Sequence, residues 1–232
     1  MDAACVLAAA TRYFRPRGIS PFRQIQAHEL VAMLRVSFYL EDLEADEVFW
    51  RMRRWERRNL RYPLLREWRT LDALGVVWDQ RYWERDLACM IRFLAPTEML
   101  AAFKMDLDNF KHVNEALGHG IGDEAIRLYC STVKGVLGNV AEVYRRGGDE
   151  VVAFAPGLDA ATVQTLAEEV RAAIEGEFRR WGKDRGLESF PTASIGLVLS
   201  EKARPFGEIV KAMDEAQRQA KEQGKNRVVF VQ

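Results

Sequence analysis

Short apolar runs in the C-terminal part of the chain predict β-strands. Residues 99–106 form the first of these runs, and residues 191–199 and 226–231 form two more. Residues 141–155 contain two further β-prone runs, which are joined by a Gly-Gly pair. Because glycine adopts a positive φ without steric cost, two such runs around a Gly-Gly pair predict a β-hairpin.

Amphipathic runs between these strands predict helices. Residues 160–181 repeat their apolar side chains at helical spacing. Further helices are expected from near Asn109, from about Gly122 to Leu137, and over residues 206–222. Strands and helices in this order predict an α/β (α+β) fold, in which helices flank a mixed, palm-like βαββαβ sheet.

Residues 1–69 carry few strand signals, and we predict that they form a small helical N-terminal region. Ser20 and Pro21 suit the cap and the first residue of a helix. An Arg-rich stretch with interleaved tryptophans, residues 51–69, ends this region. Such a stretch can bind nucleic acid, but more often it is a solvated helix with inward tryptophans, so no nucleic-acid partner is expected. The predicted domains are therefore residues 1–69 and residues 70–232.

The charge and composition argue against several classes of function. The 232 residues include 34 Lys and Arg and 34 Asp and Glu, so no global field favours nucleic acid or a membrane surface. No apolar run approaches the ~20 residues that span a bilayer. The first residues lack a basic leader, and the three cysteines have no metal-site spacing. We therefore expect a cytoplasmic protein with reduced thiols, no secretory signal and no membrane partner.

Two acidic clusters lie where predicted strands end. Asp106 and Asp108 follow the first apolar run, and Asp149 and Glu150 follow the Gly-Gly pair. Carboxylates beside bare backbone can approach a metal ion and a phosphate closely. Mg²⁺ suits such oxygen ligands, because it keeps waters and substrate phosphates as its other ligands. Solvated acids are also common in hairpin turns, so the clusters alone leave both interpretations open.

Several short motifs follow one another in a fixed order along the C-terminal part of the chain. They are residues 72–83, residues 106–123, the hairpin tip 147–151, residues 192–196 and residues 214–228. Together they resemble the GGDEF family, the diguanylate cyclases, over roughly residues 70–232. In that family a D-x-D-x-F-K-x-x-N stretch precedes a G-G-[DE]-E-F hairpin, and a D-x-A-x-x-x-A-K stretch follows it. The resemblance implies the same palm-like fold, in which Asp106 and Asp149 converge.

The resemblance implies which residues are catalytic and which bind metal. Asp106, Asp149 and the backbone carbonyl of Leu107 would hold Mg²⁺ or Mn²⁺. Asp106, Asp149 and Glu150 would be the catalytic residues, with Glu150 holding the metal or the attacking 3′-hydroxyl. Two such ions can activate a hydroxyl and stabilise the leaving pyrophosphate.

The resemblance also implies a nucleotide site. Gly147 and Gly148 would leave room for the nucleotide, besides forming the turn. Phe110 and Lys111 would line the phosphate and base site, together with Asn114. Backbone amides at the start of the helix can bind phosphate, and a lysine adds a point charge to them.

Four polar residues match the family's contacts to guanine and to the terminal phosphates. Asn114 and Asp123 occupy positions at which the family reads guanine, since an amide and a carboxylate can answer its donor–acceptor edge. Alone, Asn114 would suit a helix surface and Asp123 a helix N-cap. Lys221 and Lys225 match contacts to the β- and γ-phosphates, although cations also suit a helix end.

The chain departs from the family pattern in three places. Val151 replaces the last residue of the hairpin motif, an apolar change that should preserve packing. Upstream, Gly75 replaces Thr, and residues 79–80 read Asp-Gln in place of Asn-Arg. The R-x-x-D of the family's product-inhibition site corresponds to Gly-Asn-Val-Ala at residues 138–141, so no such feedback site is predicted.

The function that the resemblance implies is a Mg-dependent diguanylate cyclase, a nucleotidyltransferase. Two GTP would condense to cyclic di-GMP and pyrophosphate across a homodimer interface, formed by the N-terminal helices, the catalytic faces or both. Two alternatives stay open: a synthase of another cyclic di- or oligonucleotide, and a non-catalytic GTP-binding signalling module. The intact Asp106, Asp149, Glu150 and Lys221 favour catalysis over the last alternative.

Overall fold

The computed structural model describes residues 70–201 and 204–232. The predicted helical region, residues 1–69, lies outside the described residues. Within the described ranges, no helix is both long enough and apolar enough to cross a bilayer.

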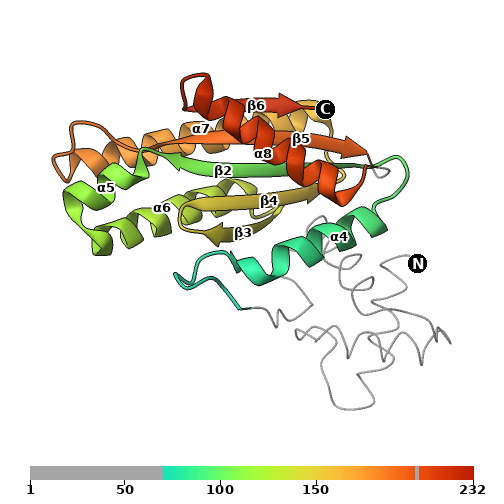
Figure 1. Cartoon of the computed structure of the whole chain (residues 1–232), viewed down its shortest axis with the longest axis horizontal. Helices are drawn as coiled ribbons and strands as arrows, with labels where there is room; N and C mark the ends of the chain where they lie inside the picture. Colours follow the sequence, from blue (N-terminus) through green and yellow to red (C-terminus); the bar gives the residue numbers. More distant parts are fainter. Residues whose placement is uncertain (1–69, 202–203) are drawn as a thin grey trace, which may run out of the picture. The chain divides into compact units, whose positions relative to one another are not determined.

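Within the part of the chain that the structure describes, six strands form one mixed sheet (Figure 1). In chain order they are β1 (Trp78–Asp79), β2 (Met99–Asp108), β3 (Glu142–Gly147), β4 (Glu150–Pro156), β5 (Thr192–Glu201) and β6 (Arg227–Val231). Across the sheet their order is β1-β3-β4-β2-β5-β6. The four inner strands pair antiparallel, whereas β1 and β6 pair parallel with β3 and β5 at the two edges. The predicted mixed, palm-like sheet is confirmed.

Helices cover both faces of this sheet (Figure 1). On one face lie α8 (Phe206–Glu222) and α4 (Trp83–Phe93), which follows the short 3-10 helix η2 (Gln80–Tyr82). On the other face lie α6 (His119–Leu137) and α7 (Ala160–Lys183). The short helix α5 (Phe110–Leu117) continues directly from the end of β2 and leads into α6. The sheet therefore forms the middle of three layers.

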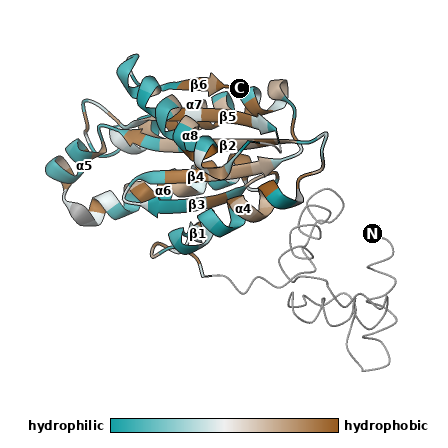
Figure 2. Cartoon of the chain, turned by 45° about the vertical axis from the view of Figure 1, so that its right-hand side comes forward, coloured by the Kyte–Doolittle hydropathy of each residue, from teal (hydrophilic) through white to brown (hydrophobic). Residues whose placement is uncertain are grey.

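Alternation along the strands divides the core between the two faces. Phe103 and Met105 of β2 belong to a buried cluster with Tyr129 of α6 and Phe178 of α7. Figure 2 shows apolar residues concentrated along the central strands, with polar residues on the outer sides of the helices. The alternate residues of β2, including Asp106, face α4 and α8, so the acidic end of this strand opens on the α8 side.

An aromatic stack fixes α4 on that side of the sheet. The Trp83 ring lies 6.3 Å from the Phe154 ring and 6.2 Å from the Phe206 ring, both nearly parallel to it. Leu87 and Met90 of the same helix are also buried. The sequence analysis assigns no element to residues 83–93, although these apolar residues recur at helical spacing.

The predicted elements agree with the structure to within a few residues. The hairpin 141–155 is present as β3 and β4, and the helix over 206–222 is present as α8. The strand predicted over 99–106 continues to Asp108, because its last two residues pair with β5. The helix predicted from Gly122 begins at His119, because Gly118 at a φ of 82° turns the chain directly from α5 into α6.

Candidate active site

The strand register places the two acidic clusters side by side. Asp106 of β2 lies directly opposite Glu150 of β4. The turn before Glu150 is formed by Gly147 and Gly148, whose φ angles of 144° and 54° lie in the region that favours glycine. A side chain at either glycine would meet no described atom within 4 Å, so the space above the turn is open. The backbone conformation therefore requires these glycines and leaves room for a ligand.

Burial and neighbouring charges shift the pKa values of Asp149 and Asp106. Burial raises the pKa of Asp149 to about 6, and the charge of Asp106 adds to this shift. Burial also raises the pKa of Asp106, although the nearby Lys221 ammonium opposes the shift. The strand register, which sets Asp106 opposite Glu150, also brings the neighbouring Asp149 close to Asp106, in agreement with the convergence that the family resemblance implies. Their roles as metal ligands and catalytic groups remain predictions.

The donor set fits a hard divalent cation. Two partly buried carboxylates that repel each other are stabilised by a cation between them. The described chain already supplies one cation there, since Lys221 Nζ lies 2.5 Å from Asp106 Oδ1. No group of three or more His, Cys, Asp or Glu side chains in the described ranges could hold a metal by itself. Further ligands would be backbone atoms, such as the carbonyl of Leu107, or substrate phosphates.

Tyr129, a buried tyrosine of α6, packs on the face of the sheet opposite to the Asp106 side chain. The Tyr129 hydroxyl is fully buried and has no hydrogen-bond partner among the described residues. Burial raises the pKa of Tyr129, and the neighbouring Cys130 and, after it, Asp106, Asp149 and Asp108 raise it further. A buried hydroxyl without a partner costs free energy. The sequence analysis did not single out this residue.

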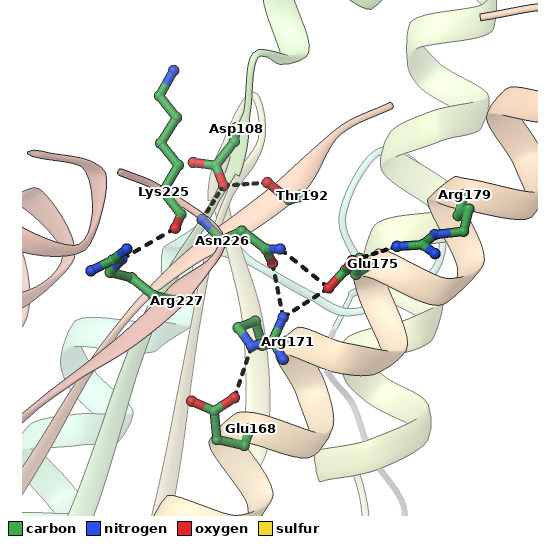
Figure 3. A network of polar contacts seen from close by, with 9 residues as sticks. All are labelled: Asp108, Glu168, Arg171, Glu175, Arg179, Thr192, Lys225, Asn226 and Arg227. Carbon is green, nitrogen blue, oxygen red and sulfur yellow. Dashed lines mark hydrogen bonds and ion pairs between the residues drawn. The ribbon is translucent and has the colours of Figure 1, made fainter. Parts of the chain in front are cut away.

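Asp108 has a different role from Asp106. Its carboxylate accepts hydrogen bonds from the hydroxyls of Thr192 and Ser194 and from the backbone N–H of Asn226. In Figure 3 this carboxylate lies at the centre of contacts that join β2, β5 and the turn before β6. Asp108 therefore fixes the loop that carries Lys225.

That loop is held in an unusual backbone conformation. Gly224, Lys225 and Asn226 all have positive φ angles, of 115°, 63° and 45°. The Asn226 side chain is fixed from the other side, because its amide bonds to Arg171 and Glu175 of α7 (Figure 3). This fixed loop allows Lys225 Nζ to reach Asn109 Oδ1, 2.6 Å away. Lys225 thus lies at the start of α5, where a phosphate site was predicted.

The helical hairpin of α5 and α6 packs Asn114, one of the two predicted guanine-reading residues, against Gly122. A Cβ atom at Gly122 would lie only 1.9 Å from Asn114 Oδ1 and 3.5 Å from the Phe110 ring. The Asn114 amide therefore occupies the space that this glycine leaves. Asp123 follows directly and is exposed. It lies within α6 and not at its N-cap, so the structure excludes the alternative of a helix cap for Asp123.

Lys111 lies apart from these groups. Its side chain is 89% exposed on α5, and its ammonium lies 3.4 Å from Glu115 one turn away. The structure therefore places Lys111 on a solvated face, in the pairing that helix spacing favours. A contact from Lys111 to phosphate remains a prediction.

A further link, which the sequence did not reveal, joins the start of the described chain to the glycine turn. Arg145 Nε donates to the carbonyl of Gly148 at 2.8 Å, and its Nη1 donates to Asp72 at 3.2 Å. Burial by itself would raise the pKa of Asp72, but backbone hydrogen bonds from Val76, Leu74 and Val77 and one from Arg145 lower it. Asp72 is therefore an anion that holds the arginine supporting the turn.

Comparison with known proteins agrees with this geometry. The family described as "Diguanylate cyclase, GGDEF domain" matches residues 69–227. The chain belongs to the GGDEF family. Diguanylate cyclase DgcM of Escherichia coli is 32% identical over 139 residues, which are 60% of this chain and 32% of that protein. Response regulator PleD of Caulobacter vibrioides is 29% identical over 175 residues, 75% of this chain and 38% of that protein.

The fold of this GGDEF domain also matches solved structures. The GGDEF domain of DgcB from Caulobacter crescentus, crystallised in complex with c-di-GMP, aligns with a TM-score of 0.60 at 24% identity. The alignment covers 71% of this chain and 96% of that one. This likeness shows the fold. Since the chain spans about a third of the length of the curated relatives described above, their activities are not transferred with it.

Proposed function

We propose that the chain is a diguanylate cyclase, which condenses two GTP into cyclic di-GMP and two pyrophosphates. The observation that carries the proposal is the Asp106–Asp149 pair beside Lys221, in a chain that belongs to the GGDEF family. Each 3′-oxygen bonds to the α-phosphorus of the other GTP. The bond between that phosphorus and the pyrophosphate oxygen breaks, and the hydroxyl proton passes to a base or to water.

Asp106 and Asp149 are the residues that would hold Mg²⁺ or Mn²⁺, together with the carbonyl of Leu107. When bound, such an ion favours ionisation of the attacking hydroxyl and neutralises charge on the phosphates. Glu150 lies opposite Asp106 and close to the hairpin tip, where it can hold the metal or the attacking hydroxyl. The raised pKa values of the two aspartates support this assignment, because a bound cation would offset both the burial of these carboxylates and the repulsion from neighbouring acidic groups.

The nucleotide would lie between the glycine turn and the start of α5. Asn114 and Asp123 would read the guanine edge, with Phe110 beside the Asn114 amide. Lys221 and Lys225 would contact the terminal phosphates. Lys221 would exchange its Asp106 partner for phosphate, and Lys225 would exchange Asn109. Positioning and electrostatics would then supply most of the rate enhancement.

The reaction requires two copies of the site. One cleft presents one GTP, so the second 3′-hydroxyl comes from a second chain in a homodimer, paired through the N-terminal helices, the catalytic faces or both. GTP is a cytoplasmic metabolite, and we therefore place the activity in the cytoplasm.

Incubation of the purified chain at high protein concentration with GTP, ATP or both, plus Mg²⁺ or Mn²⁺, tests the proposal by mass spectrometry of the products. Asp149→Ala should reduce the formation of cyclic di-GMP by roughly 100-fold or more. Glu188→Ala, which removes an exposed carboxylate from a loop, should leave it unchanged. A mixed or larger cyclic product would indicate a different synthase. Binding of GTP without any product would indicate a signalling module.

A further inference from the structure

Lys104 is a buried lysine in the central strand of the sheet. Only 8% of the residue is exposed, and it lies two positions before Asp106 on the same face of β2. Its neighbours across the strands are Val152 on β4 and Gly196 on β5. A Cβ atom at Gly196 would lie 2.4 Å from a backbone nitrogen of α8, so the helix lies directly on the sheet and covers the lysine. Lys104 is thus too enclosed to contact a nucleotide.

The ammonium of Lys104 emerges between two carboxylates at the edge of the candidate active site. Its Nζ lies 2.8 Å from Asp214 of α8 and 3.4 Å from Glu150 of β4. Asp214 also lies 3.6 Å from Arg146, whose guanidinium covers the Trp83 ring at 4.9 Å. Desolvating a cation is costly unless it is paired, so Lys104 keeps both carboxylates close to it.

Two ion pairs of opposite polarity join β2 to α8. Strand β2 supplies Lys104 and Asp106, and the helix supplies Asp214 and Lys221. Asp214 and Lys221 are seven residues apart and therefore share one face of the helix. The Lys221–Asp106 pair contains groups that bind substrate and metal in the proposed function, so it opens during the reaction. The Lys104–Asp214 pair contains no such group and can persist throughout.

We propose that Lys104 is a positioning residue for the cyclase reaction, and that it acts by holding Glu150 toward Asp106 while anchoring α8 through Asp214. This inference rests on the proposed function, because Glu150 matters for the rate only if the site performs that chemistry. Of the two contacts, the one to Glu150 controls the rate, since a shift of a reacting group by about 1 Å can cost up to 100-fold. The contact to Asp214 controls stability.

The matched variants are Lys104→Met, which removes the charge and keeps most of the stem, and Asp214→Asn, which removes the charge of the anchor on α8 for both Lys104 and Arg146. We expect Lys104→Met to lower kcat by about tenfold with the KM for GTP changed by less than about twofold. Lys104→Met and Asp214→Asn should lower the melting temperature by similar amounts, because each removes one partner of the same ion pair. Asp214→Asn should nevertheless lower kcat by less than about threefold. Lys104→Arg, which keeps the cation, should retain most of kcat.

Equal losses of kcat in Lys104→Met and Asp214→Asn would overturn the inference, as would a Lys104→Arg variant as impaired as Lys104→Met. If Lys104→Met does not fold, Lys104→Gln takes its place in the same comparison. The wild-type chain separates the two claims. An inactive wild type overturns the proposed function and this inference with it, whereas an active wild type with no difference between the variants overturns this inference alone.

Discussion

One methyl group at Gly122 would test the proposed guanine site directly. A Cβ there would lie 1.9 Å from Asn114 Oδ1 and 3.1 Å from Asn114 Cγ. Since non-bonded atoms settle near 3.5 Å, the amide oxygen must move by roughly 1.5 Å. The obstacle is the end of a side chain and not backbone, so the Gly122→Ala variant can fold by rotating Asn114 away.

Gly122→Ala should weaken GTP binding strongly but change the stability of the fold little. Losing the hydrogen bonds of one amide to guanine costs about 1–3 kcal/mol, which corresponds to a roughly 5- to 150-fold rise in the KM for GTP. Replacing a helical glycine by alanine gains up to about 1 kcal/mol, which offsets the cost of moving Asn114. We therefore expect the melting temperature to change by no more than about 4 °C.

Gly120→Ala is the matched control, because it adds the same methyl group to the same helix at a position with no described atom within 4 Å. Initial rates of cyclic di-GMP formation against GTP concentration, with melting curves for both variants, provide the test. A Gly122→Ala variant whose KM stays within about twofold of Gly120→Ala would refute the assignment of Asn114 to the base.

Three more predictions concern the acidic pair. Burial and the charge of Asp106 raise the pKa of Asp149 to about 6 in the folded state. In the unfolded state the same carboxyl releases its proton near pH 4. The free energy of unfolding therefore falls as the pH rises from about 4 to about 6. Without metal, Asp149→Asn should therefore stabilise the fold at pH 7.5 by about 1 kcal/mol after allowance for solvent screening, and should have no effect near pH 3.5, as measured by urea unfolding. Tyr129→Phe removes a buried, unpartnered hydroxyl and should raise the free energy of unfolding by about 1 kcal/mol. If the free energy of unfolding of the metal-free variant is instead lower than that of the wild type, the hydroxyl is hydrogen-bonded. Lys221→Met should raise the KM for GTP by roughly 10- to 100-fold. Lys211→Met, on the exposed side of the same helix, should leave the KM for GTP unchanged. Equal rises of the KM in both variants, measured from initial rates against GTP concentration, would exclude a specific contact of Lys221 to phosphate.

The fold was predictable from sequence where one local signal dominated. Residues 206–222 have a strong helical period, and they form α8 over that whole range. The Gly-Gly pair between β-prone runs gave the hairpin, since both glycines need a positive φ. The α4 helix lacks such a signal, because three charged residues, 84–86, fill its first turn and its N-cap residue, Tyr82, makes no capping hydrogen bond.

The candidate site was predictable in its residues but not in its connections. Asp106 and Asp149 were identified because each directly follows a strand or turn signal. The link from Asp72 through Arg145 to the glycine turn joins residues 73 positions apart, so it depends on the pairing of strands and not on local pattern. The same holds for Lys104, since a single lysine in an apolar run does not reveal the carboxylates that surround it.

The charges around the acidic pair explain how one set of residues can be stable both without and with a substrate. Alone, Asp106 and Asp149 destabilise each other, and the Lys221 ammonium compensates part of this repulsion. A metal ion bound by the two carboxylates would take over that compensation and release Lys221 to the phosphates. Because Lys104 holds α8 by a separate ion pair, this exchange need not move the helix. In the proposed function the domain would thus keep its buried charges paired in both states, while Lys221 on α8 and Lys225 on the loop before β6 change partner.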